Sequence, residues 1–295
     1  MTMNKSESPL FIIGSPRSGT SLLRLILTSH SQILIPPECG FMIWLRPKYG
    51  NWSLAENTTL LVESFLEDLF ECKKFDTWQL NRKLIEGQIL DSKPASYAEL
   101  CRAVYASFGT SINKHFKIWG DKNNFHLHHL DELLELFKTA RFLHIVRDGR
   151  DVACSYREVM AAKSKSPYAP NLKTNITDIA LEWSTNVMKI DAFMSRMPRE
   201  VAMTIRYEDL VRTPSSSVIS ICDWLGIAYE ADMLEFHRIN ISKKLEPELT
   251  LDWKKRTLQP ISNETVGRHI KLFSDNDNLA FLNICSDVLH RFFYA

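Results

Sequence analysis

Short apolar runs alternate along the chain with longer stretches in which apolar residues recur at helical spacing. The runs lie at residues 10–13, 116–119, 141–146 and 201–205. These runs predict strands, and the run at residues 10–13 predicts a strand that is buried on both faces. Helical spacing occurs at residues 20–27, 126–137, 177–197, 214–225 and 279–293, and from Gly149 to about Met160. Strands that alternate with helices predict an α/β fold with a central parallel sheet flanked by helices.

The stretches between these elements differ in character. Residues 54–114 are predicted to be mostly helical, because apolar residues recur there every three to four positions. Residues 163–175 form a polar loop, and residues 242–278 have little periodicity and predict a wrapping loop. No Pro/Gly-rich linker divides the chain. We therefore predict a single domain over residues 1–295, in which residues 41–115 form a helical insertion that serves as a substrate lid.

The composition is that of an ordinary globular protein, with 295 residues, 45% hydrophobic and 24% charged, and a net charge of +1. This balance excludes a protein that binds nucleic acid through bulk charge, so any anion site is local. No run of about 18 apolar residues occurs, and residues 1–8 lack the apolar core of a secretory signal. The six cysteines are scattered without metal-binding spacing, which is typical of reduced thiols. We therefore expect a cytoplasmic enzyme with no integral membrane segment.

The first motif with chemistry is G-S-P-R-S-G-T-S at residues 14–21, between a predicted strand and a predicted helix. Backbone amides of such a turn converge on a phosphate. The spacing matches the nucleotide phosphate loop G-x-x-x-x-G-K-[ST], except that Thr20 stands in place of the lysine. Because that lysine reaches the β- and γ-phosphates, its absence argues against triphosphate chemistry. The motif favours a ligand with one phosphate carrying a small transferable group, with Arg17 as the side-chain cation; an ordinary strand-to-helix turn is the alternative.

A second anion motif follows the strand at residues 141–146, where V-R-D-G-R-D-V-A-C-S leads into a helix. Ligands of open parallel sheets bind at the carboxyl ends of the strands. There Arg147 can grip a phosphate with its fork of donors, and Ser155 can add a hydroxyl two turns into the helix. The alternative is a capped helix start, in which Asp148 and Asp151 favour the helix dipole.

Together the two motifs resemble those of the sulfotransferases that use 3′-phosphoadenylyl sulfate (PAPS). P-R-S-G-T-S is similar to the family's 5′-phosphosulfate loop, and V-R-D-G-R-D-V-A-C-S is similar to its 3′-phosphate segment. The run P-R-S-G-T-S-L-L-R, followed by a helix that ends in histidine and then by a glutamate, most resembles the tyrosylprotein sulfotransferase branch and its bacterial relatives. The resemblance covers most of the chain and implies the phosphate-loop-like sulfotransferase fold, with PAPS as co-substrate.

The resemblance also implies roles for the matching residues. It implies that the 5′-phosphosulfate is held by Arg17, Ser18, Gly19, Thr20 and Ser21. It implies that Arg147 and Ser155 hold the 3′-phosphate and that Tyr207, in I-R-Y-E-D-L, lies near the nucleotide. The segment at residues 265–271 resembles the family's C-terminal nucleotide loop more loosely. Arg268 and Lys271 are its candidate phosphate partners, and exposed solvated cations are the alternative.

Sulfuryl transfer is an in-line displacement that needs a base for the acceptor proton and a positive charge at the bridging oxygen. Glu38, in P-P-E-C-G, is the candidate base, because the resembled branch has a catalytic glutamate at the matching place, in a C-G-E-E segment. Lys122 matches a family lysine that stabilises the bridging oxygen. A solvated surface position is the alternative for both residues. We expect no metal, because the sequence has no acidic cluster or histidine pair at metal spacing.

Histidine is a second candidate for the base. Small-molecule sulfotransferases place a catalytic histidine two residues after the matching lysine, but Asn124 stands there and an amide cannot act as a base. His126 lies nearby and remains the second candidate, whereas His30 is expected to cap or pack the end of the first helix.

The acceptor is open: a hydroxyl (or amine) of a small molecule, sugar, lipid or peptide fits equally, and the oligomeric state is unknown. The large aromatics of the lid are expected to be core rather than substrate wall; they are Trp44, Tyr49, Trp52 and Trp78. The loop at residues 163–173 is a candidate gate. Two alternative functions are a phosphate-loop kinase or nucleotide hydrolase, and a non-catalytic nucleotide-binding protein of the same fold.

Overall fold

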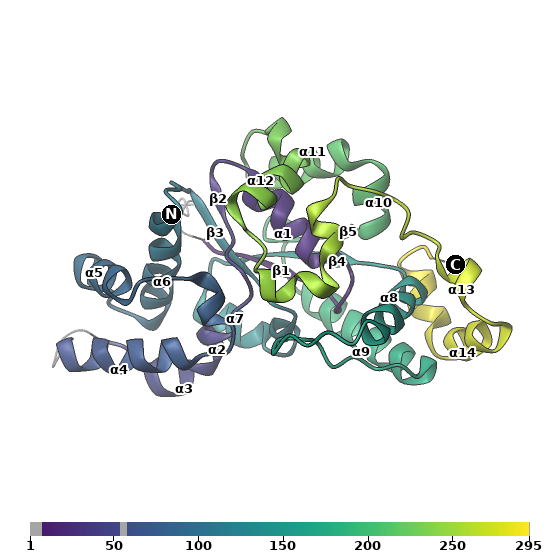
Figure 1. Cartoon of the computed structure of the whole chain (residues 1–295), viewed down its shortest axis with the longest axis horizontal. Coiled ribbons are helices and arrows are strands. Elements are labelled where there is room, and N and C mark those ends of the chain that lie inside the picture. Colours follow the sequence, from purple (N-terminus) through teal and green to yellow (C-terminus); the bar gives the residue numbers. More distant parts are fainter. Residues whose placement is uncertain (1–7, 54–57, 295) are drawn as a thin grey trace. The chain divides into compact units, whose positions relative to one another are not determined.

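The computed structural model describes residues 8–53 and 58–294 (Figure 1). The polar start at residues 1–7 and residues 54–57 of the predicted helical stretch lie outside the described part. The described strands form one sheet in the order β2-β3-β1-β4-β5. They are β1 (Leu10–Ile13), β2 (Ile33–Leu34), β3 (Ile118–Lys122), β4 (Arg141–Val146) and β5 (Ala202–Arg206). The pairings of β2 with β3 and of β4 with β5 are parallel, and the predicted α/β fold is confirmed.

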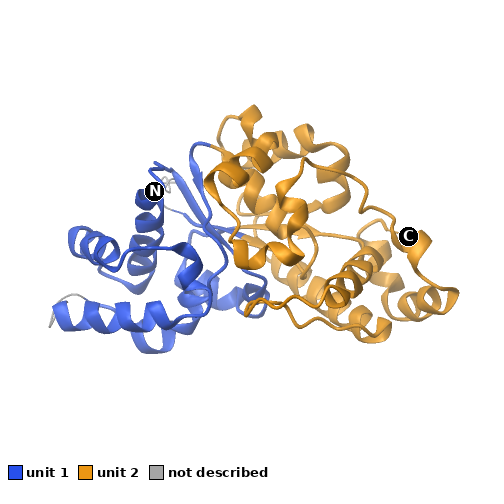
Figure 2. Ribbon diagram, in the orientation of Figure 1, with its two compact units in different colours: residues 1–11, 31–141 blue, residues 12–30, 142–295 orange. Residues whose placement is uncertain are grey.

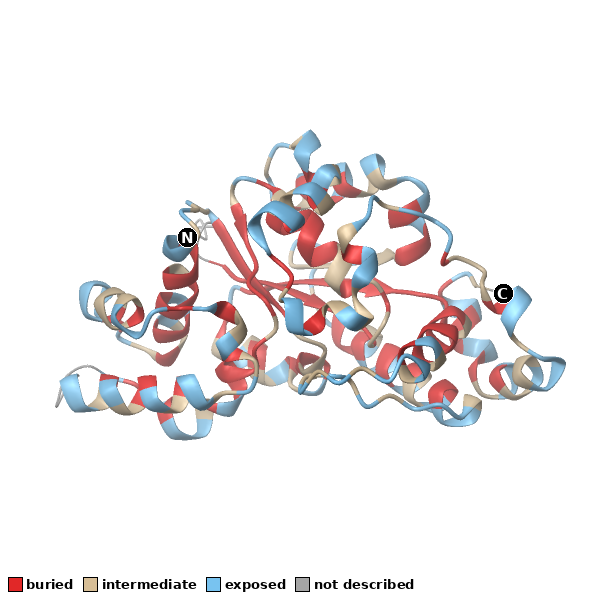
Figure 3. Cartoon of the chain, viewed as in Figure 1, coloured by how far each residue is buried: buried red, intermediate tan, exposed pale blue. Residues whose placement is uncertain are grey.

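The burial of the strands explains their sequence. Every residue of β1, β3 and β4 is buried, as the red strands of Figure 3 show. β1 is apolar throughout, as expected for a strand buried on both faces. β3 and β4 also bury polar or charged residues, namely Asp121, Lys122, Arg141 and His144. β5 lies at an edge of the sheet, and all of its residues are partly or fully exposed.

Two compact units make up the chain, shown in Figure 2: a first unit of residues 1–11 and 31–141, and a second unit of residues 12–30 and 142–295. The helices of the first unit are α2 (Phe41–Trp44), α3 (Arg46–Tyr49), α4 (Thr58–Glu71), η1 (Phe75–Trp78), α5 (Arg82–Ser92), α6 (Tyr97–Ser111), η2 (Asn124–His128) and α7 (Leu130–Leu136). Those of the second unit are α1 (Thr20–Ser29), α8 (Gly149–Ala161), α9 (Ile176–Met194), α10 (Tyr207–Arg212), α11 (Pro214–Leu225), η3 (Ala231–Glu235), α12 (Phe236–Lys243), η4 (Glu248–Trp253), η5 (Lys255–Leu258), α13 (His269–Leu272) and α14 (Asp275–Arg291).

An aromatic cluster fills the interior of the first unit. Trp78 packs against Phe41, Tyr105 and Phe108 with ring centroids 6.0, 5.2 and 5.3 Å away, in the edge-on geometry that aromatic pairs prefer. Tyr49, Trp52 and Trp78 are buried, whereas Trp44 is 38% exposed. The interpretation of these aromatics as core therefore holds for three of the four.

The second unit has its own core, in which α9 and α14 pack on α8. Trp183 of α9 is 1% exposed and touches Phe281 of α14 at 5.9 Å between ring centroids. Its indole Nε1 donates to the carbonyl of Arg147 at 3.1 Å. A Cβ at Gly149 would overlap the Trp183 ring, so glycine is required there. Core packing thus fixes the backbone of the second anion motif.

Some element boundaries differ from those predicted. The strand predicted at residues 116–119 occupies 118–122, because Asp121 and Lys122 are buried with polar partners that hydropathy does not reveal. The helix predicted at 126–137 is divided into η2 and α7. The predicted wrapping loop at 242–278 contains η4, η5, α13 and the start of α14. β2 and α12 were not predicted.

Candidate functional site

The phosphate-loop motif lies between β1 and α1, as predicted. Arg17 and Gly19 adopt positive φ angles of 66° and 96°. Glycine accepts this conformation without strain, whereas an arginine held there is uncommon. A Cβ at Gly14 would come within 2.7 Å of the Ile145 carbonyl oxygen, and one at Gly19 would overlap the ring of Tyr207. The two glycines therefore allow the loop to pack directly against β4 and Tyr207.

The start of α1 is prepared for an anion. Gly19 is its N-cap and supplies no side-chain cap, and the first turn carries no acidic residue. A helix start of this kind favours a negatively charged ligand through the helix dipole. Ser18 and Thr20 are buried and Ser21 is partly buried. Ser18 Oγ is buried and has no hydrogen-bond partner among the described residues.

Arg147 follows β4 and lies against the phosphate loop. Its Nη1 donates to the carbonyl oxygen of Arg17 at 3.1 Å and its Nη2 to that of Thr265 at 2.7 Å. Its guanidinium stacks over the Tyr207 ring, 4.5 Å from the centroid. Arg147 Nε is buried without a hydrogen-bond partner in the described part of the chain. Unmade buried hydrogen bonds are costly, so Ser18 Oγ and Arg147 Nε fit the oxygens of a bound phosphate ligand.

The remaining nucleotide candidates join the same cluster. Ser155 is 5% exposed, and its Oγ accepts a hydrogen bond from Arg17 Nε at 3.1 Å. Tyr207 begins α10, and its hydroxyl lies 2.7 Å from Thr265 Oγ1. The structure thus brings Arg17, Arg147, Ser155 and Tyr207 together with the start of the late segment at 265–271.

Asp151 anchors that late segment, a role the sequence did not reveal. It is 1% exposed, and its carboxylate accepts the amides of Gly267 at 2.7 Å and His269 at 3.0 Å, and contacts His269 Nδ1 at 2.9 Å. Burial alone would raise the pKa of Asp151, but the hydrogen bonds from His269 and Gly267 and the charge of Arg147 lower it overall. The sequence suggested for Asp151 only the alternative role of an acid that favours the helix dipole. Its partners Gly267 and His269 are more than one hundred residues away, and no local pattern indicates them.

The two cations of the late segment behave differently. Arg268 donates to Glu158 at 2.7 Å, and this carboxylate raises the pKa of Arg268. Lys271 lies on α13 and is exposed. A phosphate role for either residue therefore stays a prediction.

Glu38 forms a compact ionic cluster in the first unit. Its Oε1 is bound by the ammonium of Lys122, the last residue of β3, and its Oε2 accepts from Lys74 Nζ at 2.7 Å. The Lys122 side chain is 1% exposed, whereas that of Glu38 is 13% exposed. The two residues predicted to act in catalysis are thus in direct contact, and Lys74 is a further member that the sequence did not indicate.

His126 lies in a closed environment behind this cluster. The hydroxyl of Tyr105 donates to Asp121 Oδ2, and Asp121 Oδ1 lies 3.3 Å from His126 Nδ1. His126 is fully buried, and burial together with the charge of His129 lowers its pKa to about 3. A neutral imidazole sealed from solvent is poorly placed to accept a proton from an acceptor, which favours Glu38 as the base.

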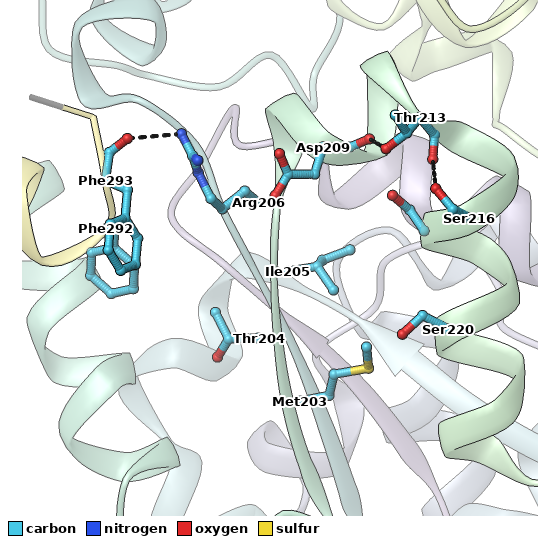
Figure 4. Close-up of a pocket in the computed structure, with 11 residues that line it drawn as sticks. Met203, Thr204, Ile205, Arg206, Asp209, Thr213, Ser216, Ser220, Phe292 and Phe293 are labelled. Atoms are coloured by element: carbon cyan, nitrogen blue, oxygen red, sulfur yellow. Dashed lines mark hydrogen bonds between the residues drawn. The ribbon is translucent and has the colours of Figure 1, made fainter.

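A cavity of about 560 Å³ opens elsewhere in the second unit, along β5 (Figure 4). It is lined by Met203, Thr204, Ile205, Arg206, Asp209, Thr213, Ser216, Ser217, Ser220, Phe292 and Phe293. Arg206 donates to the Phe293 carbonyl at 3.1 Å across it. None of the predicted site residues lines this cavity, so the hollow and the anion motifs are separate features.

The candidate gate loop at residues 163–173 is held by side-chain hydrogen bonds. In the loop between α8 and α9, Ser164 Oγ donates to Asp252 and Ser166 Oγ donates to the Leu249 carbonyl, so the loop is tied to η4. All six cysteines lie in the described part, and none forms a disulfide. No helix of the described residues is long and apolar enough to span a membrane.

Comparison with known proteins places these features in a family. Residues 9–231 match the sulfotransferase family. The chain is 23% identical to protein-tyrosine sulfotransferase 2 of Gallus gallus over 234 residues, which cover 79% of this chain and 55% of that protein, so it spans about half the length of this curated relative.

Solved structures share the fold. A sulfotransferase domain from the curacin biosynthetic pathway superposes with a TM-score of 0.61 at 21% identity, covering 95% of this chain and 97% of that one. Mouse sulfotransferase SULT7A1, solved with PAP, superposes with a TM-score of 0.52 at 15% identity, covering 95% and 84%. The match over residues 9–231, on the motifs that carry the anion cluster, shows that the chain belongs to the sulfotransferase family.

Proposed function

We propose that the protein transfers a sulfuryl group from PAPS to a hydroxyl or amine acceptor by in-line displacement, with Glu38 as the base. The donor assignment rests on the hydrogen bonds between the two anion motifs. Arg17 of the first motif donates to Ser155 of the second, and Arg147 of the second motif donates to the backbone carbonyl of Arg17. A ligand with phosphates at two positions suits a cluster built from two anion motifs. The mouse neighbour solved with PAP supports the same donor.

We assign the phosphates of the donor to the second unit. The 5′-phosphosulfate is proposed to bind the amides and side chains of residues 17–21. There the buried Ser18 Oγ has no hydrogen-bond partner among the described residues, so its hydroxyl can donate to a phosphate oxygen. The 3′-phosphate is proposed to bind Arg147 and Ser155. The Tyr207 ring, which stacks on the Arg147 guanidinium, would hold the guanidinium in its orientation. Arg268 and Lys271 are proposed as outer phosphate partners. Thr20, in place of the lysine of nucleoside triphosphatases, supports a sulfated nucleotide over a triphosphate.

We assign the proton and charge chemistry to the first unit. The acceptor oxygen attacks sulfur as the bond from sulfur to the bridging phosphate oxygen breaks, and the acceptor proton passes to a Glu38 oxygen. The leaving group is adenosine 3′,5′-bisphosphate (PAP), which takes the electron pair of the broken bond. The Lys122 ammonium, buried and hence only weakly screened, is suited to stabilise negative charge on the bridging oxygen.

The acceptor is proposed only as a class that bears a hydroxyl or amine. Small molecules, sugars, lipids and peptides all fit the chemistry, and the name of the Gallus gallus relative favours starting with phenols and tyrosyl peptides. We propose a cytoplasmic location, which the six unpaired thiols support; cell fractionation tests it.

The test of the donor is thermal stabilisation by PAP compared with ATP plus magnesium. PAP is expected to raise the midpoint of unfolding by several degrees at concentrations where ATP plus magnesium has little effect. A larger shift with ATP would favour the kinase or hydrolase alternative. Binding of PAP without transfer of ³⁵S from labelled PAPS to any of a panel of phenols, sugars and tyrosyl peptides would favour a non-catalytic nucleotide-binding protein.

A further inference from the structure

We propose that Lys74 is the positioning residue of the base: its ammonium holds Glu38 ionised and oriented while Lys122 turns to the bridging oxygen. This inference rests on the proposed role of Glu38. It starts from a conflict in the cluster, because the ammonium of Lys122 binds the Glu38 carboxylate and is also assigned to the leaving oxygen. An ammonium that moves toward new negative charge weakens its hold on the carboxylate, so the base needs a second anchor.

Lys74 has the geometry of that anchor. Its Nζ lies 2.7 Å from Glu38 Oε2, on the carboxylate oxygen opposite the one that Lys122 binds. The Lys74 side chain is 21% exposed, so the pair is shielded from water more than a surface ion pair. Each lysine has its own oxygen, and the loss of one contact leaves the other in place.

The backbone around Lys74 is held so that this contact persists. Lys74 has a φ of 71° and is the N-cap of η1. Its carbonyl accepts the Thr77 hydroxyl at 2.6 Å and the Thr77 amide at 3.1 Å. A non-glycine residue stays at positive φ only where the surrounding contacts stabilise this strained conformation, and such residues are frequent at functional sites.

Two further contacts tie the Lys74 segment to the Glu38 segment. Trp78 Nε1 donates to the Pro37 carbonyl at 2.9 Å, and Cys39 Sγ donates to the Lys73 carbonyl at 3.6 Å. The two contacts flank the Lys74–Glu38 pair on both segments. η1 and the loop before it therefore hold the Lys74 ammonium beside the Glu38 carboxylate.

Other ionisable groups of the first unit near Glu38 are consistent with this role. His126, on η2, is neutral because its pKa is lowered, and burial raises the pKa of the adjacent Cys39 thiol so that it stays protonated. Lys74 and Lys122 are two positive charges that contact Glu38 within the first unit. Removal of either is expected to raise the pKa of the carboxyl, because an opposite charge at this distance lowers it by about one unit or more.

The decisive experiment measures the ionisation of Glu38 directly and needs no acceptor. The protein is labelled with ¹³Cδ-glutamate, the Glu38 signal is identified by its loss in Glu38→Gln, and its titration is followed in the wild type, K74M and K73M. Lys73 is the exposed neighbour and serves as the matched control. K74M is expected to move the Glu38 midpoint up by about one unit, whereas K73M leaves it in place and K74R restores it. An unchanged midpoint in K74M overturns the proposal.

A second arm links this shift to turnover. The pH dependence of kcat is measured with PAPS and 2-naphthol, and of PAPS hydrolysis with water as acceptor. K74M is expected to move the acidic limb upward by about one unit. Through the lost orientation of Glu38 it is also expected to lower the plateau value of kcat about ten-fold, with the affinity for PAP unchanged. A Glu38 midpoint that shifts while the acidic limb stays in place overturns the catalytic role of Lys74. Full turnover in Glu38→Gln instead overturns Glu38 as the base. The titration of the Glu38 carboxyl in K74M does not depend on turnover, so it distinguishes a failure of the Lys74 proposal from a failure of Glu38 as the base. K74Q replaces K74M if the latter does not fold.

Discussion

Arg17 Nε donates to Ser155 Oγ at 3.1 Å and so joins two motifs that lie 138 residues apart in the sequence. The arginine sits in the turn before α1, and the serine lies two turns into α8. The contact links the predicted 5′-phosphosulfate loop to the predicted 3′-phosphate segment, so the two halves of donor binding are expected to be energetically coupled.

The first prediction is that Arg17 and Ser155 act non-additively on nucleotide binding. Ser155→Ala is expected to lower PAP affinity about ten-fold, because a hydrogen bond to a charged group is worth roughly 1.5–3 kcal/mol. Arg17→Ala together with Ser155→Ala is expected to cost less than the sum of the single changes. Calorimetric titration with PAP of the four proteins gives the coupling energy, and strict additivity would show that the contact plays no part in binding.

The second prediction concerns the phosphate that Arg147 reads. Arg147→Ala is expected to lower PAP affinity by about ten- to a hundred-fold through loss of a charge-assisted contact. AMP, which lacks the 3′-phosphate, should bind the variant and the wild type almost equally. Arg147 also donates to two backbone carbonyls. Arg147→Lys therefore serves as a control that keeps the positive charge but loses the planar, multiple-donor geometry of the guanidinium. Equal loss for AMP and PAP would mean that Arg147 only shapes the loop.

The third prediction concerns the base. Glu38→Gln keeps the shape of the side chain but removes its proton acceptor, so turnover should fall by on the order of 10²–10⁴. PAP affinity should change little. Lys122→Ala should lower turnover and weaken donor binding as well. His126→Gln should be mild because His126 is buried and neutral; near-normal turnover in Glu38→Gln with inactivity in His126→Gln would assign the base to the histidine.

The fourth prediction concerns the anchor of the late segment. Asp151→Asn keeps the shape of the side chain but halves its accepting capacity for Gly267 and His269. The loop at residues 265–269 should loosen, and the KM for PAPS should rise about ten-fold with kcat nearly unchanged. His269→Ala should have a smaller effect, since the two backbone amides remain bound. A fall in kcat at constant KM would contradict this assignment.

The fifth prediction concerns stability at acid pH. Glu246 is bound by Arg24 of α1 at 2.7 Å and by Lys254 at 2.6 Å. Burial alone would raise the pKa of Glu246, but the charges of Lys254 and Arg24 outweigh it and lower the value from 4.5 to about 2. The folded state therefore prefers the ionised form, and this stabilisation is full above pH 4.5 and is lost as the pH falls toward 2.

Glu246→Gln should accordingly destabilise the protein by about 3 kcal/mol at pH 7, because it removes the buried carboxylate that pairs with both cations. The loss relative to the wild type should shrink between pH 5 and pH 3. Urea unfolding at both pH values measures it. Glu248→Gln, on the exposed pair with Lys244, is the matched control and should be nearly silent.

The sequence alone determined those features that depend on local pattern. Apolar runs at residues 10–13 and 141–146 predicted strands, and the run at 10–13 predicted a strand buried on both faces, because such a strand is shielded from water at every position. The glycines at positions 14 and 19, in their turn before a helix, predicted an anion-binding loop from backbone geometry alone. The resemblance to the sulfotransferases rested on such local motifs, and the family match confirms it.

Tertiary structure decided what depends on partners distant in the chain. The contact of Lys122 with Glu38, the second cation Lys74, and the hold of Asp151 on Gly267 join residues 84, 36 and 116 positions apart. The observed strand β3 ends at Lys122, later than the predicted strand at residues 116–119. Lys122 can lie in a buried strand because Glu38 supplies a counter-charge, which the sequence pattern does not show. Hydropathy reports the solvent preference of a residue but not its partner. The longer apolar strands and the phosphate loop could therefore be predicted from the sequence, whereas the two-residue strand β2 and the ionic contacts around Glu38 required the fold.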